Sequence, residues 1–228
     1  MNFLHVISIS GGIVEKSCLL RVFKELPSQI DYFKKMFLGG FQEADIGIAK
    51  FPEDDVATFS LLLKWVYTGE IPAVLWESDT PVRRKENWFP FKLYALGDKL
   101  CLPEVMDRTF DAYTESLDSY GLYPAPMDIS DGYSCTPENS PLRAFLCSAY
   151  VYLLLRYPED NTPGSYTNER MHDALVAQPD LARDILPLLR AQSGKEVTDP
   201  LDNIPSCHYH THPAADVCPW KGLIIHRN

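Results

Sequence analysis

The spacing of apolar side chains between residues 31 and 72 predicts two helices joined by a short strand. The first helix is expected after Asp31, because its apolar residues lie at positions i, i+1, i+4 and i+5, which share one side of a helix. These residues are Tyr32, Phe33, Met36 and Phe37. Gly39 and Gly40 are expected to end this helix, because glycine tolerates the left-handed conformation found at helix ends. Alternation in residues 46–48 predicts the strand.

A second, longer helix follows in the same stretch, and its two ends are marked by residue type. Asp54 or Asp55 is expected to cap its first turn with a side-chain oxygen. Gly69 and Pro72 are expected to end it, because proline cannot continue a helix. Its apolar face consists of Val56, Phe59, Leu62, Leu63, Val66 and Tyr67.

The apolar pattern predicts a β-hairpin before this stretch and a helical region after it. Ile7 and Ile9 alternate with serines like a strand, Gly11-Gly12 is expected to turn the chain, and Ile13 begins a second strand. Downstream, helices are expected at 91–100, from Pro103, at 141–157, at 167–177 and from Pro179, with a kink or boundary at Pro187. Residues 118–139 are rich in glycine and proline and predict a linker.

Size and charge limit the possible functions. The 228 residues suffice for one substantial core, or one core and a smaller helical module. The net charge is −10, which argues against general binding to a phosphate backbone, so no nucleic-acid partner is expected. Arg83-Arg84-Lys85 is the one dense basic run, and a solvated loop accounts for it.

Compartment is indicated by the cysteines and the apolar runs. The six cysteines are Cys18, Cys101, Cys135, Cys147, Cys207 and Cys218. Residues 1–10 lack the basic start of a secretory signal, and the longest apolar run, at 149–155, is too short to span a bilayer. We therefore expect free thiols, a cytoplasmic or nuclear protein and no membrane partner.

One constellation near the C-terminus has the residue types of a metal site. Cys207, His210, His212 and Cys218 could supply two thiolates and two imidazoles, the ligands that tetrahedral zinc prefers. Four protein ligands would fill the coordination shell, so such a zinc would be structural and not catalytic. His208 is the less suitable ligand. A solvated histidine-rich tail, or an ordered cap without metal, is the alternative.

The stretch at 31–72 resembles the BTB/POZ family, and in particular fungal BTB proteins. The matching motifs are F-x-x-M-F-x-G-G-F-x-E at 33–43, W-x-Y-T-G-E-I-P at 65–72 and K-L-Y-x-L-x-D-K-L at 92–100. Fungal relatives also carry a similar Cys-x-Tyr-His-x-His motif. The N-terminal hairpin departs from the family pattern, with Phe23 in the place of a histidine.

The resemblance implies a fold class and a set of domains. It implies an α+β protein with the BTB/POZ fold, a small sheet with a helix cluster, followed by a mostly helical C-terminal region. The expected domains are a BTB/POZ domain at 1–117, a linker at 118–139, a helical module at 140–192 and a Cys/His-containing tail at 193–228.

The resemblance also implies a protein–protein interaction module and not an enzyme. A homodimer is expected, and a cullin scaffold is a possible partner, with the chain acting as a substrate adaptor of a ubiquitin ligase. The partner-binding residues would be Phe41 and Glu43, which match a hydrophobic-x-Glu motif. The alternative is a dimeric transcription or chromatin regulator with a structural zinc tail. No nucleophile–base pair, phosphate loop or HExxH helix is found in the sequence, so no catalytic residue and no cofactor besides zinc is expected.

Overall fold

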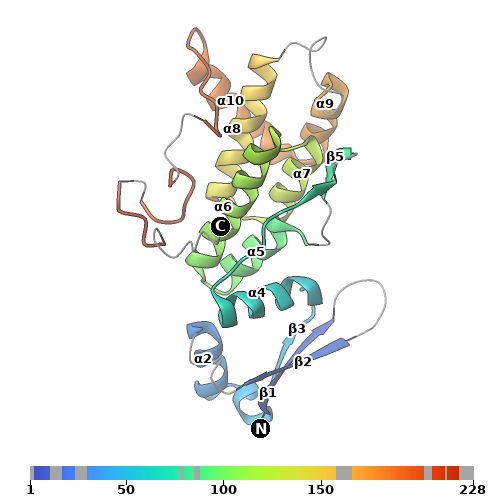
Figure 1. Ribbon diagram of the computed structural model, residues 1–228, viewed down its shortest axis with the longest axis vertical. Helices are drawn as coiled ribbons and strands as arrows, with labels where there is room; N and C mark the ends of the chain where they lie inside the picture. Colours follow the sequence, from blue (N-terminus) through green and yellow to red (C-terminus); the bar gives the residue numbers. More distant parts are fainter. Residues whose placement is uncertain are drawn as a thin grey trace. The chain divides into compact units, whose positions relative to one another are not determined.

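We describe the chain from a computed structural model (Figure 1). It describes residues 3–10, 17–23, 30–77, 80–84, 88–157, 166–202, 207–213 and 215–220, and only the backbone of 3–10, 17–23, 76–77 and 80–84. The expected turn at Gly11-Gly12, the strand start at Ile13 and Lys85 of the basic run lie outside the described residues.

Contacts divide the chain into two compact units. The first unit comprises Met1–Pro72 and Asn87–Val105, and the second comprises Ala73–Glu86 and Met106–Asn228. The strands are β1 (Phe3–Ser10), β2 (Ser17–Phe23), β3 (Ile48–Phe51), β4 (Trp76–Glu77) and β5 (Thr80–Arg84). The helices are α2 (Asp31–Leu38), α3 (Gln42–Ile46), α4 (Val56–Thr68), α5 (Pro90–Lys99), α6 (Pro103–Tyr120), α7 (Pro126–Cys135), α8 (Pro141–Arg156), α9 (Asn168–Ala177) and α10 (Pro179–Gln192).

In the first unit, the backbones of three strands are paired in the order β2-β1-β3. β1 runs antiparallel to β2, with Ile7 opposite Leu20, and parallel to β3, with Ile7 opposite Ala49. The expected alternation through Ile7 and Ile9 lies within β1. The strand predicted at 46–48 begins only at Ile48, because Ile46 ends α3 and Gly47 has a φ of 67°, a left-handed conformation that glycine adopts without strain.

Aromatic side chains make the core of the first unit. Phe33 of α2, Phe51 of β3 and Phe59 of α4 are buried. The Phe51 ring centroid lies 4.7 Å from that of Phe59 and 6.0 Å from that of Phe33. Burial of rings of this size supplies much of the hydrophobic stabilisation of a small unit.

The predicted cap of α4 is present, and it is Asp55. The Asp55 carboxylate accepts the backbone N–H of Thr58 at 2.8 Å and the Thr58 hydroxyl at 2.7 Å. Lys92 lies 3.4 Å from the same carboxylate, and Asp54 instead pairs with Lys99 at 2.6 Å. The helix ends at Gly69, whose φ is 70°. The sequence therefore located both ends of α4 correctly.

The second unit is a group of helices around α8, which is buried along most of its length. Phe110 of α6 packs edge-on against Phe145 of α8 at 5.1 Å, and α6 and α8 lie side by side (Figure 1). α7 and α10 also contact α8, and α9 contacts both of them. α10 runs through Pro187 without ending there.

One segment predicted as a linker is partly helical. Helix α7 lies inside 118–139, with Pro126 in its first turn and with Ile129 and Tyr133 buried. Proline is favourable in a first helical turn, where its missing N–H would have no partner anyway. The residues that suggested a linker therefore include a helix start.

The predicted fold class, α+β with the BTB/POZ fold, is corrected by the structure. Among the residues whose side chains are described, the chain is mostly helical, with nine helices and only the short strand β3, which makes up 2% of the sequence. The prediction relied on the resemblance of the motifs at 33–43, 65–72 and 92–100 to the BTB/POZ family. The helical apolar stripes that extend from α4 to α10 instead bury most of the described core.

Among the described helices, none combines the length and the apolar character needed to cross a membrane.

Candidate metal centre

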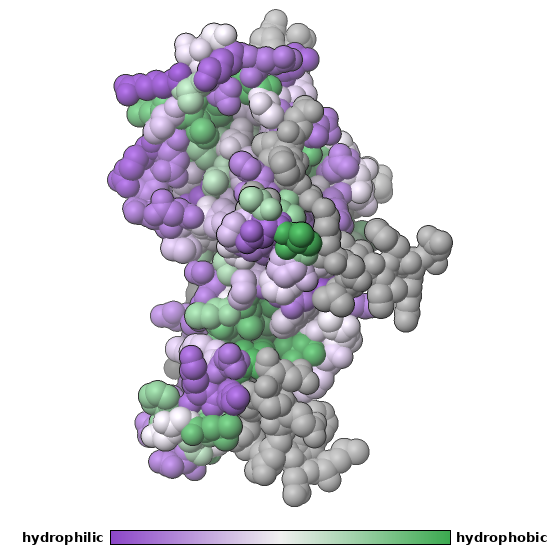
Figure 2. Space-filling view, turned by 90° about the vertical axis from the view of Figure 1, so that its left-hand side faces the viewer, coloured by the Kyte–Doolittle hydropathy of each residue, from purple (hydrophilic) through white to green (hydrophobic). Residues whose placement is uncertain are grey.

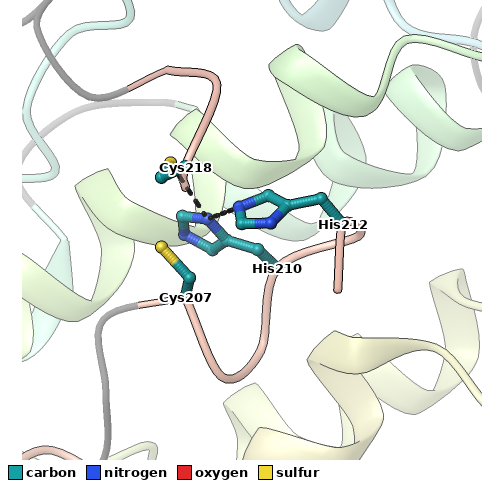
Figure 3. Close-up of side chains that lie close together, drawn as sticks. All are labelled: Cys207, His210, His212 and Cys218. Carbon is teal, nitrogen blue, oxygen red and sulfur yellow. Dashed lines mark hydrogen bonds between the residues drawn. The ribbon is translucent and has the colours of Figure 1, made fainter. Parts of the chain in front are cut away.

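Four side chains near the C-terminus converge on one point. Cys207, His210, His212 and Cys218 each offer one ligand atom, and these atoms all lie within 4.8 Å of one another (Figure 3). Cys207, His210 and Cys218 are buried, and His212 is half-buried. The structure thus brings together all four residues that the sequence predicted as metal ligands, and the buried group could hold a metal ion.

Turns in the backbone place these ligands. The N–H of His210 donates to the carbonyl of Cys207 at 3.2 Å, so the chain reverses between the first two ligands. A second turn, from Asp216 N–H to the Pro213 carbonyl at 3.0 Å, lies between His212 and Cys218. His208 does not belong to this group: it is exposed to solvent and packs edge-on against Tyr209.

Tyr209 anchors this segment between two helices of the second unit. Its ring lies 5.8 Å from Phe110 of α6 and 5.4 Å from Phe145 of α8. Burial raises the pKa of the Tyr209 phenol, which is therefore neutral. An aromatic side chain held in this way fixes the residues on either side of it. A solvated histidine-rich tail does not describe this segment.

Hydrogen bonds of the two imidazoles define which nitrogens are free to bind an ion. Nε2 of His210 lies 2.8 Å from a carboxylate oxygen of Asp111, which can only accept, so this nitrogen carries the proton. Nδ1 of His212 lies 3.0 Å from the carbonyl of Pro213, so this nitrogen is also protonated. The remaining nitrogens, His210 Nδ1 and His212 Nε2, face each other at 3.2 Å (Figure 3).

Asp107 of α6 holds the segment from the helix side. Its carboxylate accepts the backbone N–H of Thr211 at 2.7 Å, the Thr211 hydroxyl at 3.0 Å and the Trp220 indole N–H at 2.8 Å. Asp107 is fully buried. One carboxylate therefore binds the chain between the two histidines and again just after Cys218.

The electrostatics of the centre favour a cation. Burial by itself would raise the pKa of the Cys218 thiol, but hydrogen bonds with the Trp220 backbone and with His212 lower it to about 7. Burial by itself would lower the pKa of His210, but the hydrogen bond and charge of Asp111 and the charge of Asp107 raise it. Thiolate character at Cys218 is what metal binding requires.

Asp107, Asp111, Thr211 and Trp220 were not predicted as site residues. Two aspartates four positions apart share one face of a helix, and Asp107 interrupts the apolar face of α6. That interruption was the available signal. Nothing local in the sequence indicates that their partners lie about a hundred residues later.

The two predicted partner-binding residues lie in the first unit. Phe41 precedes α3 and is 58% exposed, and Glu43 in the first turn of α3 is half-buried. None of the cysteines whose side chains are described is in a disulfide bond, namely Cys101, Cys135, Cys147, Cys207 and Cys218.

The chain was also compared with known proteins. No protein-family model and no curated protein matches it.

Proposed function

We propose that the Cys207, His210, His212 and Cys218 group binds one structural zinc ion that fixes the C-terminal segment to α6. The observation that carries this proposal is the contact between His210 Nδ1 and His212 Nε2 at 3.2 Å. When both rings are neutral and donate to Asp111 and to the Pro213 carbonyl, each of these nitrogens is unprotonated, so the contact is repulsive unless a metal ion or a shared proton lies between them. The two sulfur ligands close to the same point favour a metal ion over a shared proton.

The distances between ligand atoms suit tetrahedral zinc. Zinc–nitrogen bonds of about 2.0–2.1 Å and zinc–sulfur bonds of about 2.3 Å place two nitrogens roughly 3.3 Å apart, and a nitrogen and a sulfur roughly 3.6 Å apart. The corresponding separations are 3.2 Å for the two imidazoles and 3.8 Å from Cys218 Sγ to His210 Nδ1. The group as a whole spans up to 4.8 Å, so binding would also draw its more distant ligand atoms closer together.

The ligand set also indicates the role of the ion. Two thiolates balance the charge of Zn²⁺, and soft sulfur ligands with imidazoles favour zinc over magnesium or calcium. Four protein ligands leave no position for water or substrate, which is typical of structural sites. Binding to a site that the unfolded chain lacks stabilises the folded state.

Cobalt substitution tests this proposal. The purified chain, stripped of metal and titrated with Co²⁺, is expected to show one equivalent bound with the intense absorption of thiolate-to-cobalt charge transfer and tetrahedral cobalt. Cys218→Ser is expected to lose most of the charge-transfer intensity and to bind Co²⁺ far more weakly. Cys101→Ser is the matched control, since Cys101 is exposed and belongs to the first unit. A wild-type titration without the thiolate bands would contradict the proposal.

We further propose that the chain acts as a protein-binding module, with a surface on α2 and α3 as the docking face. Leu38, Phe41 and Ile46 are 72%, 58% and 50% exposed there, and Glu43 and Asp45 lie in the same short helix. Figure 2 shows that hydrophobic and hydrophilic residues lie side by side on the face of the molecule that it draws. Exposed apolar side chains flanked by acids suit a partner with an apolar groove and a basic rim.

A second copy of this chain and a cullin scaffold are the two partners to test. Light scattering measures whether the wild type is a dimer, and a pulldown measures binding to purified cullins. Phe41→Ala is expected to weaken whichever of the two interactions, dimerisation or cullin binding, the wild type shows. Tyr67→Ala removes another exposed aromatic side chain and is expected to leave that interaction unchanged. A monomeric wild type that binds no cullin would contradict both partner assignments.

A further inference from the structure

The His210 nitrogen that faces away from the proposed ion, Nε2, contacts a carboxylate of another element. Asp111 lies on α6, and its Oδ1 is 2.8 Å from His210 Nε2. The His210 side chain is 2% exposed and that of Asp111 is 30% exposed. This hydrogen bond is therefore largely shielded from water on the histidine side, and a low local dielectric strengthens a hydrogen bond.

The position of Asp111 decides how His210 can bind an ion. A carboxylate accepts a proton from Nε2 and cannot donate one, so the lone pair must lie on Nδ1. Nδ1 is the nitrogen that faces His212 Nε2 at 3.2 Å and Cys218 Sγ at 3.8 Å. The ring also packs edge-on against Phe110, the residue before Asp111, at 6.2 Å. Orientation and tautomer are thus both set by α6.

We propose, as an extension of the zinc proposal, that Asp111 is a positioning residue that makes His210 an Nδ1 ligand and strengthens its bond to the ion. A carboxylate that accepts the second N–H of a ligating imidazole raises the basicity of that imidazole. Removal of such a partner typically weakens metal binding 10–100-fold. The metal centre then includes α6, although α6 supplies no ligand.

The test combines metal affinity with the spectroscopic state of His210. Zinc affinity is measured by competition with a chelator, and the ring nitrogens are observed by long-range proton–nitrogen correlation in the zinc-loaded, ¹⁵N-labelled chain. Asp111→Ala is expected to bind zinc about 10–100-fold more weakly. Its Nε2 proton is expected to exchange faster with water. Asp111→Asn keeps an acceptor oxygen without the charge and is expected to lose less affinity.

Controls separate this inference from the zinc proposal on which it rests. Asp118→Ala changes an exposed aspartate of the same helix and is expected to leave zinc affinity unchanged. If the wild type binds zinc with both thiolates, but Asp111→Ala binds it equally well or the wild-type His210 binds through Nε2, the role of Asp111 is refuted and the zinc site stands. A wild type that binds no zinc refutes both.

Discussion

The indole of Trp220 donates a hydrogen bond of 2.8 Å to the carboxylate of Asp107, which precedes it by 113 residues. The same carboxylate accepts two hydrogen bonds from Thr211. A buried carboxylate is stable only where donors replace its water. The C-terminal segment therefore supplies the donors that stabilise the buried Asp107 carboxylate, and Asp107 in turn holds that segment in place.

Replacement of Asp107 by alanine is expected to destabilise the second unit. The change leaves the Trp220 indole and the Thr211 amide without their acceptor, which is expected to reduce the free energy of unfolding by about 3 kcal/mol. Urea denaturation of the zinc-loaded protein measures this loss. Asp118→Ala is the control and is expected to change stability by less than about 0.5 kcal/mol. A loss below about 1 kcal/mol for Asp107→Ala would show that the contact does not anchor the segment.

Removal of the metal is expected to lower the thermal stability of the wild type. An ion present at about 100 times its dissociation constant stabilises the folded state by roughly 2.7 kcal/mol. Addition of a strong chelator should therefore lower Tm in calorimetry. Cys207→Ser should show a lower Tm that the chelator leaves unchanged, whereas Cys101→Ser should respond like the wild type. An identical chelator response in all three proteins would argue against the site.

Asp55 is expected to make the first unit sensitive to acid. Burial by itself would raise the pKa of this carboxyl, but hydrogen bonds from Thr58 and the charge of Lys92 lower it below its ordinary value of 3.8. A lowered pKa stabilises the fold at pH values above the unfolded value, and this contribution is lost as the pH falls through the lower folded value. The free energy of unfolding should therefore decrease as the pH falls below about 4.

Two variants separate the cap from the charge at Asp55. Asp55→Ala is expected to cost about 1 kcal/mol at neutral pH, because the Thr58 N–H loses its acceptor. Asp55→Asn keeps a capping oxygen and should cost less, yet it should lose the acid dependence assigned to this residue. Chemical denaturation at several pH values measures both. The assignment would be wrong if Asp55→Asn kept the full acid dependence of the wild type.

Arg143 is expected to be the main polar contact between α7 and α8. Its guanidinium donates to the carbonyls of Tyr133 and Thr136, lies over the Tyr133 ring at 4.8 Å and approaches Asp180 at 3.5 Å. Arg143→Met keeps most of the volume but leaves buried carbonyls unpaired, at a cost of about 3 kcal/mol. Arg183→Met is the control.

The control differs from Arg143 in exposure. Arg183 also pairs with Asp180, but its side chain is 70% exposed, so its loss is expected to cost less than about 0.5 kcal/mol. Thermal denaturation measures both variants. Equal effects of the two substitutions would contradict the role given to Arg143.

Local features of the fold could be predicted from the sequence where the residue type at a position favours one structural role. The Asp55 cap, the end of α4 at Gly69 and the four metal-ligand candidates follow from such residues. The helix beginning at Pro126 was not predicted, because proline is common in linkers and in first helical turns alike.

The fold class and the surroundings of the site were beyond local patterns. The α+β prediction rested on a family resemblance of motifs between residues 33 and 100, and these motifs do not show how much of the chain becomes helical, so the predicted fold class was wrong. Asp107 and Asp111 approach His210, Thr211 and Trp220 only after the chain has folded. Their charges would otherwise place them on a solvated face of α6.

X-ray absorption at the zinc edge tests the central claim most directly. For the zinc-loaded chain we predict two sulfur neighbours at about 2.3 Å and two nitrogen neighbours at about 2.0–2.1 Å. Cys218→Ser should lower the sulfur count, and Cys101→Ser should not. A zinc shell of oxygen and nitrogen alone, or one with five or six neighbours, would contradict a closed site made by Cys207, His210, His212 and Cys218.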